Sequence, residues 1–170
     1  MAEEIYLINC VCTANICRSP MAERLLTHAL EGEKEDWARR YKVVSSGIVA
    51  MEGQKASKNS VKALKTIGLD LTNHSSQRTS QEIVERSALT LCMTKGHEQL
   101  IKVNFPDCAT LILLFRGLLP RSKGQEIIDP YGANLNEYEE CRDMLVEAIP
   151  SIIDYLRKEK PKSIFNKKIA

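Results

Sequence analysis

The sequence predicts an α/β fold, a single domain in which short apolar strands alternate with amphipathic helices. Two observations predict it: four apolar runs of strand length, and helical periodicity in the segments between them. Strands separated by helices form an open parallel sheet covered on both faces, and a chain of 170 residues fits one such domain. We place this domain at residues 1–158 and expect a basic C-terminal tail at residues 159–170.

The first half of the chain begins with Ile5–Cys12, a near-continuous apolar run that is typical of a buried parallel strand. Arg18–Glu31 is expected to be helical, with Pro20 in its first turn. The apolar face of this helix would be made by Met21, Ala22, Leu25, Leu26, Ala29 and Leu30. Tyr41–Ser45 is expected to form the second strand, and Val61–Ile67 a helix that Gly68 ends.

The second half continues the alternation. Its expected elements are a helix at Gln81–Arg86, a strand at Ala88–Met93, a helix at Gly96–Val103 and a strand at Thr110–Phe115. The last helix is the longest, with an apolar face made by Tyr138, Cys141, Leu145, Ala148, Ile149, Ile152, Ile153 and Leu156. Pro150 interrupts this pattern and is expected to kink the helix. In open parallel sheets the ligand binds at the carboxyl ends of the strands, which places the active site at the turn after the first strand.

Composition and charge exclude several classes of protein. Basic and acidic residues are nearly balanced, at 24 against 22, which argues against charge-driven binding of nucleic acid. No run approaches the ~20 apolar residues of a membrane span, and the first residues, Met-Ala-Glu-Glu, are acidic where a signal peptide is basic. We therefore expect a cytoplasmic protein whose six cysteines are free thiols. Residues 157–170 hold six basic side chains and one acidic one, so this end is either a solvated terminus or a contact for an acidic partner or a membrane surface.

The turn after the first strand carries a candidate catalytic motif, Cys12 followed by five residues, Arg18 and Ser19. A loop that ends at a helix N-terminus can bind phosphate through its backbone N–H groups, and the same environment favours a cysteine thiolate, the nucleophilic form. Arg18 offers a planar pair of donors for two phosphoryl oxygens, and Ser19 can hydrogen-bond the thiolate. Only Cys12 among the six cysteines has an arginine six positions later. The alternative interpretation of Cys12 is a small buried residue at the end of a strand.

Attack on a phosphate ester also needs an acid that protonates the leaving oxygen. Asp129 and Pro130 form the only Asp-Pro pair in the chain, and this pair lies in a loop between the fourth strand and the last helix. This loop can reach the carboxyl end of the sheet, so Asp129 is the candidate general acid. The alternative is an ordinary Asp-Pro turn.

These residues belong to a longer pattern that resembles the low-molecular-weight protein tyrosine phosphatase family. The matching segments follow the family's order over about residues 4–158: Val11–Glu23, Ser45–Gly47, Asn73–His74, Leu91–Thr94 and Asp129–Gly132. The resemblance implies a four-stranded parallel sheet and hydrolysis of a phosphorylated protein through a phosphocysteine intermediate, with no metal and no cofactor.

The resemblance also implies a role for each matched residue. Cys12 resembles the nucleophile, Arg18 the phosphate clamp and Asp129 the general acid. Asn15 resembles the residue that holds the phosphate-binding loop in its strained shape, supported by Ser45 and His74. From the residues alone, His74 would be interpreted as a surface or capping histidine. The phosphate-binding loop itself would be Thr13, Ala14, Asn15, Ile16, Cys17 and Arg18.

Other features of the resemblance concern oxidation and the substrate wall. Cys17 resembles the neighbouring cysteine that can trap the nucleophile as a disulfide, and Ile16, Met51 and Tyr131 are expected to line the substrate. The chain departs from the family at Ala14, where glycine is usual; if that position needs a positive φ, alanine costs on the order of 1 kcal/mol. Met51 stands near where an aromatic ring is common, and Tyr131 is single where animal members tend to have two tyrosines.

The substrate stays open between related enzymes. Ile16 resembles tyrosine phosphatases, whereas protein-arginine phosphatases place threonine at that position, so the loop favours phosphotyrosine. Met93–His97 instead resembles the bacterial arginine branch. Arsenate reductases of this fold use two further redox cysteines; Cys92 stands where one would lie, although Cys108 is distant and Cys92 also suits a strand end. A phosphate-binding module without activity is the non-enzyme alternative, and hydrolysis of p-nitrophenyl phosphate separates it from an enzyme.

Overall fold

The four strands form one parallel sheet with the order β2-β1-β3-β4 in the computed structural model, which describes residues 5–159. The strands are β1 (Tyr6–Cys12), β2 (Tyr41–Gly47), β3 (Ser87–Cys92) and β4 (Leu111–Leu114). β1 lies at the centre, with Cys12 opposite Gly47 of β2 and Val11 opposite Cys92 of β3. The predicted α/β fold with a parallel sheet is confirmed.

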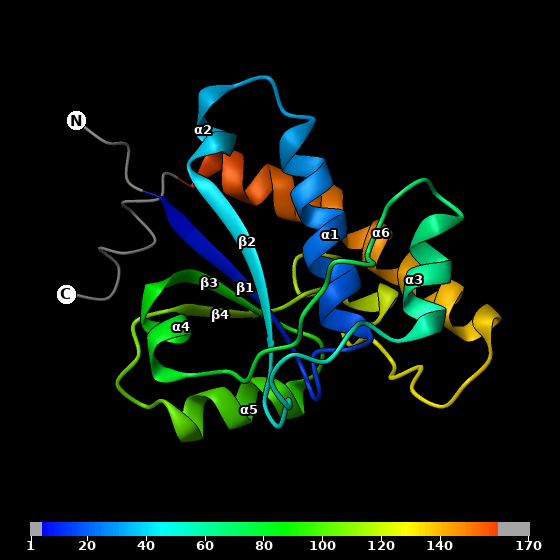
Figure 1. Ribbon diagram of the computed structural model, residues 1–170. Helices are drawn as coiled ribbons and strands as arrows, with labels where there is room; N and C mark the ends of the chain where they lie inside the picture. The colour runs from blue at the N-terminus through cyan, green and yellow to red at the C-terminus, as the bar shows by residue number, and fades with distance from the viewer. Residues whose placement is uncertain (1–4, 160–170) are drawn as a thin grey trace.

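Helices cover both faces of this sheet (Figure 1). One face carries α1 (Arg18–Glu31), α3 (Lys58–Lys65) and α6 (Leu135–Lys158), and the other carries α4 (Gln81–Arg86) and α5 (Lys95–Asn104). The two apolar cores match this division, because alternate residues of a strand point to opposite faces. Cys10 and Cys12 pack with α1 and α6, whereas Val11 packs with α4 and α5.

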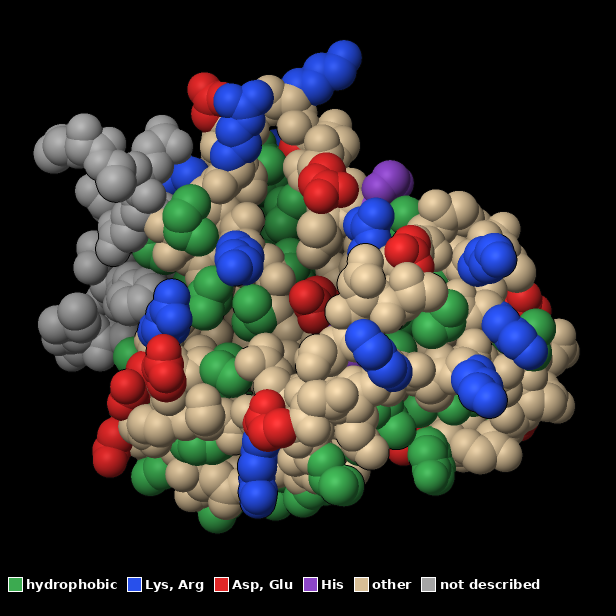
Figure 2. Space-filling model, in the orientation of Figure 1, with side chains coloured by type: hydrophobic (Ala, Val, Ile, Leu, Met, Phe, Trp, Pro, Cys, Tyr) green, Lys and Arg blue, Asp and Glu red, His purple; other side chains and the backbone are tan. Residues whose placement is uncertain are grey.

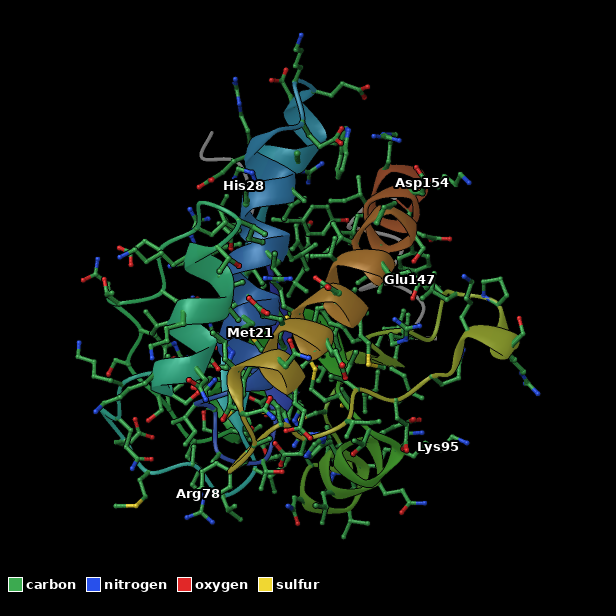
Figure 3. All side chains as sticks on the ribbon, turned by 90° about the vertical axis from the view of Figure 1, so that its right-hand side faces the viewer. Met21, His28, Arg78, Lys95, Glu147 and Asp154 are labelled. Atoms are coloured by element: carbon green, nitrogen blue, oxygen red, sulfur yellow. The ribbon has the colours of Figure 1, made fainter. Side chains whose placement is uncertain are left out.

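The helix α1 lies between α3 and α6, and Figure 3 shows its residue Met21 at the centre of this layer. Met21 is completely buried, as its place on the predicted apolar face requires. Leu25 and Leu26 are also buried on α1, and Leu145 is buried on α6. This packing fixes the N-terminus of α1 against the sheet, directly after the end of β1.

Helix boundaries follow their capping residues. Ser57 accepts a hydrogen bond from the backbone N–H of Ser60, so α3 begins at Lys58, three residues earlier than the periodicity predicts. The short helix α2 (Asp36–Arg39) and the 3₁₀ turn at Arg121–Lys123 have no counterpart among the predicted elements. The helix α6 begins with a capping box, in which Asn134 and Glu137 bond each other's backbone.

Pro150 lies within α6 and does not end it. A proline in a helix removes the N–H that would bond the carbonyl four residues earlier. Both Pro150 and Val146 are exposed, so this carbonyl lies on the water-facing side of α6. The helix therefore continues as one element to Lys158, and the predicted kink stays a prediction.

The surface carries mixed charge, and Figure 2 shows basic and acidic side chains interspersed over the face turned toward the viewer. Within residues 5–159, no helix is both long and apolar enough to cross a membrane. The predicted basic tail, apart from Glu159, lies outside the described residues.

Candidate active site

The candidate site lies at the carboxyl end of β1, where a loop of five residues connects Cys12 to Arg18. β2 reaches this loop at Gly47. A Cβ atom on Gly47 would lie 2.7 Å from the backbone N of Asn15 and 2.7 Å from the carbonyl O of Thr13. Only glycine permits this approach, which lets the N–H of Ile48 bond the carbonyl of Cys12 at 3.0 Å. The end of β2 therefore packs directly against the loop and holds it in place.

The loop stores its backbone strain at Asn15. Asn15 has φ = 56° and is the one residue other than glycine with a positive φ in the part of the chain that the structure describes. The φ of Ala14 is not positive, so the cost foreseen for alanine at that position does not arise. Asparagine tolerates this region better than most residues, because its short polar side chain can bond locally.

The side chain of Asn15 is held by three hydrogen bonds. Its Nδ2 donates to Ser19 Oγ and to Ser45 Oγ, both at 2.8 Å, and its Oδ1 accepts from the backbone N of Gln77 at 2.9 Å. The structure thus brings Ser45 to Asn15 as expected. Gln77 is a further support that the sequence did not indicate, because it acts through its backbone.

Two more groups complete this support. His74 Nε2 lies 2.7 Å from the backbone O of Asn15, so His74 contacts the strained peptide rather than the asparagine side chain. Ser45 Oγ donates to the carboxylate of Glu23 on α1. Burial raises the pKa of Glu23. A network of this kind fixes the loop before any ligand binds.

Cys12 is almost fully buried, and its Sγ lies 3.0 Å from Ser19 Oγ. This is the contact that the sequence predicts for a stabilised thiolate. Cys17 lies in the same loop, where its Sγ is 3.3 Å from the hydroxyl of Tyr138. Burial raises the pKa of Cys17 and raises the pKa of Tyr138 to about 12. The disulfide between Cys12 and Cys17 stays a prediction, which peptide mapping after peroxide treatment checks.

Arg18 begins α1 and is buried, yet its guanidinium has partners on several elements. NH1 donates to the carbonyl O of Ile127 at 3.1 Å, and NH2 donates to Thr13 Oγ1 at 3.3 Å. NH2 also lies 3.0 Å from Asp129 Oδ2. Nε is buried and has no hydrogen-bond partner within residues 5–159. A donor that is buried and unpaired costs free energy unless a ligand satisfies it.

The ion pair with Arg18 holds Asp129 against the phosphate-binding loop, although the two residues are far apart in the sequence. Asp129 is half-exposed, and its Oδ1 accepts from the backbone N of Tyr131 at 3.2 Å. Together these side chains line a pocket of about 200 Å³. Its lining residues are Cys12, Thr13, Ala14, Ile16, Cys17, Arg18, Asp129 and Tyr131. Of the three residues expected in the substrate wall, Ile16 and Tyr131 line this pocket, whereas Met51 is 68% exposed and lies outside its lining.

His97 is a residue near the site to which the sequence assigned no role. Its Nε2 lies 2.9 Å from Thr13 Oγ1, and its Nδ1 lies 3.0 Å from Thr94 Oγ1. Burial lowers the pKa of His97 to about 4, and the neighbouring Arg18 guanidinium contributes in the same direction. Asp129 and Glu126 oppose this shift. The imidazole is therefore neutral at physiological pH.

This shift predicts how stability depends on pH. An unfolded histidine has a pKa of about 6.5, so between pH 4 and 6.5 the unfolded chain binds more protons at His97 than the folded protein does. The contribution of neutral His97 to the free energy of unfolding is fully present above about pH 6.5 and is lost as the pH falls toward 4. From pH 7 to 5 the loss is on the order of 2 kcal/mol. Urea unfolding of a His97→Gln variant should lack this contribution.

The matched control is His28→Gln, because His28 is exposed at the other end of α1. That variant should keep the wild-type dependence on pH. Equal losses of unfolding free energy for wild type and His97→Gln between pH 7 and 5 would contradict the assignment of a neutral, buried His97.

Within the described residues, no group of three or more His, Cys, Asp or Glu side chains is arranged to hold a metal ion. The polar groups that converge on the pocket are instead a thiol, a guanidinium and a carboxylate at a loop of the kind that binds phosphate.

The fold and the pocket define the class of protein, and comparison with known sequences agrees. The family model for low molecular weight phosphotyrosine protein phosphatase matches residues 7–162. The chain belongs to this family and is a phosphatase of the low-molecular-weight class.

Individual relatives fall in two groups by name. A protein-arginine-phosphatase of Bacillus subtilis is 34% identical over 152 residues, which cover 88% of this chain and 96% of the relative. A probable low molecular weight protein-tyrosine-phosphatase, EpsP of Ralstonia nicotianae, is 32% identical over 147 residues, which cover 86% and 93%. Among solved structures, the tyrosine phosphatase amsI of Erwinia amylovora matches with a TM-score of 0.79 and 30% identity, over 91% of this chain and 95% of that one.

Proposed function

We propose that this phosphatase hydrolyses phosphotyrosine in proteins through a phosphocysteine intermediate. The observation that carries the proposal is a pocket lined by Cys12, Arg18 and Asp129, in which Arg18 pairs with Asp129 and has a buried Nε without a partner within residues 5–159. A phosphoryl oxygen at this point would satisfy Nε, and the fork geometry of arginine suits two such oxygens. The ring of the substrate would then lie between Ile16 and Tyr131, which both line the pocket.

The first half of the reaction transfers the phosphoryl group to the enzyme. The thiolate of Cys12 attacks phosphorus, a sulfur–phosphorus bond forms, and the bond from phosphorus to the tyrosine oxygen breaks. Asp129 in its acid form gives its proton to that oxygen, so tyrosine leaves as a neutral phenol. Arg18 stabilises the charge on the phosphoryl oxygens during the transfer.

The second half returns the enzyme to its starting state. The carboxylate of Asp129 takes a proton from a water molecule, which attacks phosphorus and breaks the bond to sulfur. Inorganic phosphate leaves, and Cys12 becomes a thiolate again. Ser19 Oγ, 3.0 Å from the sulfur, can donate a hydrogen bond that stabilises this leaving group.

A prediction tests the role of Asp129. Replacing it with asparagine removes the proton donor, so kcat should fall roughly 10²–10⁴-fold for a phosphate ester of a poor alkyl leaving group. The loss should be smaller for p-nitrophenyl phosphate, whose leaving group needs no proton. Asp107→Asn, on the exposed turn after α5, is the matched control and should keep the wild-type rate. Equal losses on both substrates would assign Asp129 a structural role only.

Phosphoarginine is the second candidate substrate, and two observations favour it. The Bacillus subtilis relative is named a protein-arginine-phosphatase, and Met93–His97 resembles that branch. Against it, Ile16 is apolar and offers no hydrogen bond to a guanidinium. Nitrogens buried there without a partner cost roughly 1–3 kcal/mol each. A comparison of kcat/KM on phosphotyrosine and phosphoarginine peptides distinguishes the two.

The same argument predicts the effect of a single substitution. Ile16→Thr places a hydroxyl beside the pocket, so the ratio of kcat/KM for phosphoarginine to that for phosphotyrosine should rise by about tenfold. Ile67→Thr makes the same change at an exposed site away from the pocket and should leave the ratio unchanged. If wild type already hydrolyses phosphoarginine faster than phosphotyrosine, the interpretation of Ile16 fails and Met93–His97 is the better guide.

The remaining alternatives have less support. Burial raises the pKa of Cys92 to about 12, and its side chain packs in the core beneath α4 and α5. A thiol in this state is unreactive, which argues against the redox relay of an arsenate reductase. An inactive phosphate-binding module is tested by p-nitrophenyl phosphate, because hydrolysis at Cys12 excludes it.

A further inference from the structure

A chain of hydrogen bonds connects the phosphate-binding loop to the helix on the opposite face of the sheet. It begins at Arg18, whose NH2 donates to Thr13 Oγ1, and it continues to His97 Nε2 and from His97 Nδ1 to Thr94 Oγ1. Thr94 is the N-cap of α5, so the chain ends at a fixed point of the fold. Figure 3 shows the start of α5 at Lys95, beside Thr94 in sequence.

The chemistry of these groups fixes the direction of the first bond and allows two tautomers of His97 for the others. A guanidinium can only donate, so Thr13 Oγ1 accepts from Arg18. A hydroxyl has one hydrogen and two lone pairs, so Thr13 Oγ1 either donates to Nε2 of His97 or accepts a second hydrogen bond from it. A neutral imidazole fits both arrangements, with Nδ1 donating to Thr94 Oγ1 in the first and accepting from it in the second. A charged ring would place a second positive charge beside Arg18.

The surroundings of His97 keep it neutral. The side chain is 6% exposed, and the charged groups that face it are Arg18 from α1 and Asp129 and Glu126 from the loop before α6. Burial and Arg18 together hold the pKa of His97 near 4. His97 is therefore neutral at physiological pH and places no second positive charge beside Arg18.

We propose that neutral His97 is a positioning residue that orients Arg18 through Thr13, so that the guanidinium is preset for a phosphoryl group. This inference rests on the proposed role of Arg18 as the phosphate clamp. In the first step of the reaction Asp129 is protonated, so its charge no longer holds NH2 of Arg18. The hydrogen bonds to Thr13 and to the carbonyl of Ile127 are then the anchors that remain.

The test measures binding of inorganic phosphate by calorimetry at pH 7, together with kcat and KM. His97→Leu removes the hydrogen-bond partner of Thr13, and Thr13→Val removes the hydroxyl with little change of shape. Each should weaken phosphate binding about tenfold, and the double variant should lose no more than the larger single loss, because both changes break one chain. The amide of His97→Gln can accept or donate at the same place, so this variant should stay within about threefold of wild type.

Several outcomes would overturn the proposal. Phosphate affinity unchanged in Thr13→Val, losses that add in the double variant, or the same loss in His97→Gln as in His97→Leu would each assign His97 a packing role. Thr13→Val keeps the test decisive if His97→Leu does not fold. His28→Gln is the control, since His28 lies at the end of α1 far from Lys95 in Figure 3, and it should bind phosphate as wild type does.

The failure of this proposal is distinguishable from the failure of the proposed function. A wild type that binds phosphate but hydrolyses neither p-nitrophenyl phosphate nor a phosphotyrosine peptide would contradict the proposed function, and the comparison of phosphate affinities would still decide the role of His97. A wild type that does not bind phosphate would contradict both.

Discussion

Cys12→Ser should abolish turnover of every phosphate ester while leaving the affinity for inorganic phosphate within about threefold of wild type. A serine hydroxyl is a much weaker nucleophile than a thiolate at neutral pH, and an alkoxide is a much poorer leaving group than a thiolate in the second step, so the catalytic cycle cannot be completed. The groups that would bind phosphate stay in place, because Arg18 keeps its bonds to Ile127 and Thr13 and Asn15 keeps the loop in shape. Steady-state kinetics with p-nitrophenyl phosphate and calorimetry with phosphate measure the two effects.

The control for this variant is Cys108→Ser, which makes the same atomic change outside the pocket lining. It should keep kcat within about twofold of wild type. Residual activity of Cys12→Ser above about one thousandth of wild type would contradict the assignment of Cys12. Loss of phosphate affinity in a folded Cys12→Ser protein would contradict the separation of binding from chemistry.

Arg18→Lys should lower kcat roughly 10²–10³-fold, although the positive charge is kept. The guanidinium bonds Ile127 and Thr13 and meets Asp129, and it still has a buried Nε without a partner within residues 5–159. An ammonium group is a point charge on a flexible stem and cannot keep these contacts while presenting two parallel donors to a phosphoryl group. Stopped-flow or steady-state kinetics with p-nitrophenyl phosphate measure the loss of kcat.

A matched substitution separates geometry from general effects of the change. Arg39 is exposed on α2, where its guanidinium pairs with Asp36, so Arg39→Lys should keep the wild-type rate. An Arg18→Lys variant within tenfold of wild-type kcat would show that charge alone suffices and that the clamp assignment is wrong.

The centre of the site could be predicted because its parts are close in sequence. Cys12, Arg18 and Ser19 lie within eight residues between a strand and a helix, and local patterns indicate both elements. The place of Asp129 in the family pattern and in the loop before the last helix also predicts its role. The ion pair of 3.0 Å that joins it to Arg18 could not be predicted, because it depends on the packing of segments more than a hundred residues apart.

Other parts of the site depend on tertiary contacts that leave little trace in the sequence. Gln77 supports Asn15 through its backbone N–H, so its residue type carries no signal. His97 stands out in the sequence only as the end of the Met93–His97 resemblance, although Thr94 three residues earlier is a possible N-cap. The family pattern predicts Met51 in the substrate wall, whereas the segment after β2 leaves Met51 exposed.

Boundaries of elements show the same division between local and distant causes. The apolar period places the body of α3, but its start is set by the Ser57 cap, which could have been recognised as a capping signal. The helix α2 spans only Asp36–Arg39 and is too short for a periodic pattern. The strain foreseen at Ala14 lies one residue later, at Asn15, because Asn15 has side-chain partners on β2 and α1 that hold a positive φ.

The measurement that tests the central claim most directly is the identification of the phosphorylated residue during turnover. The enzyme is mixed with excess p-nitrophenyl phosphate, quenched in acid within milliseconds, digested and mapped by mass spectrometry. We expect one phosphoryl group, on Cys12, in wild type and none in Arg18→Lys under the same conditions. Phosphate on Cys17, Cys92 or Ser19 with Cys12 unmodified, while turnover proceeds, would contradict the proposed mechanism.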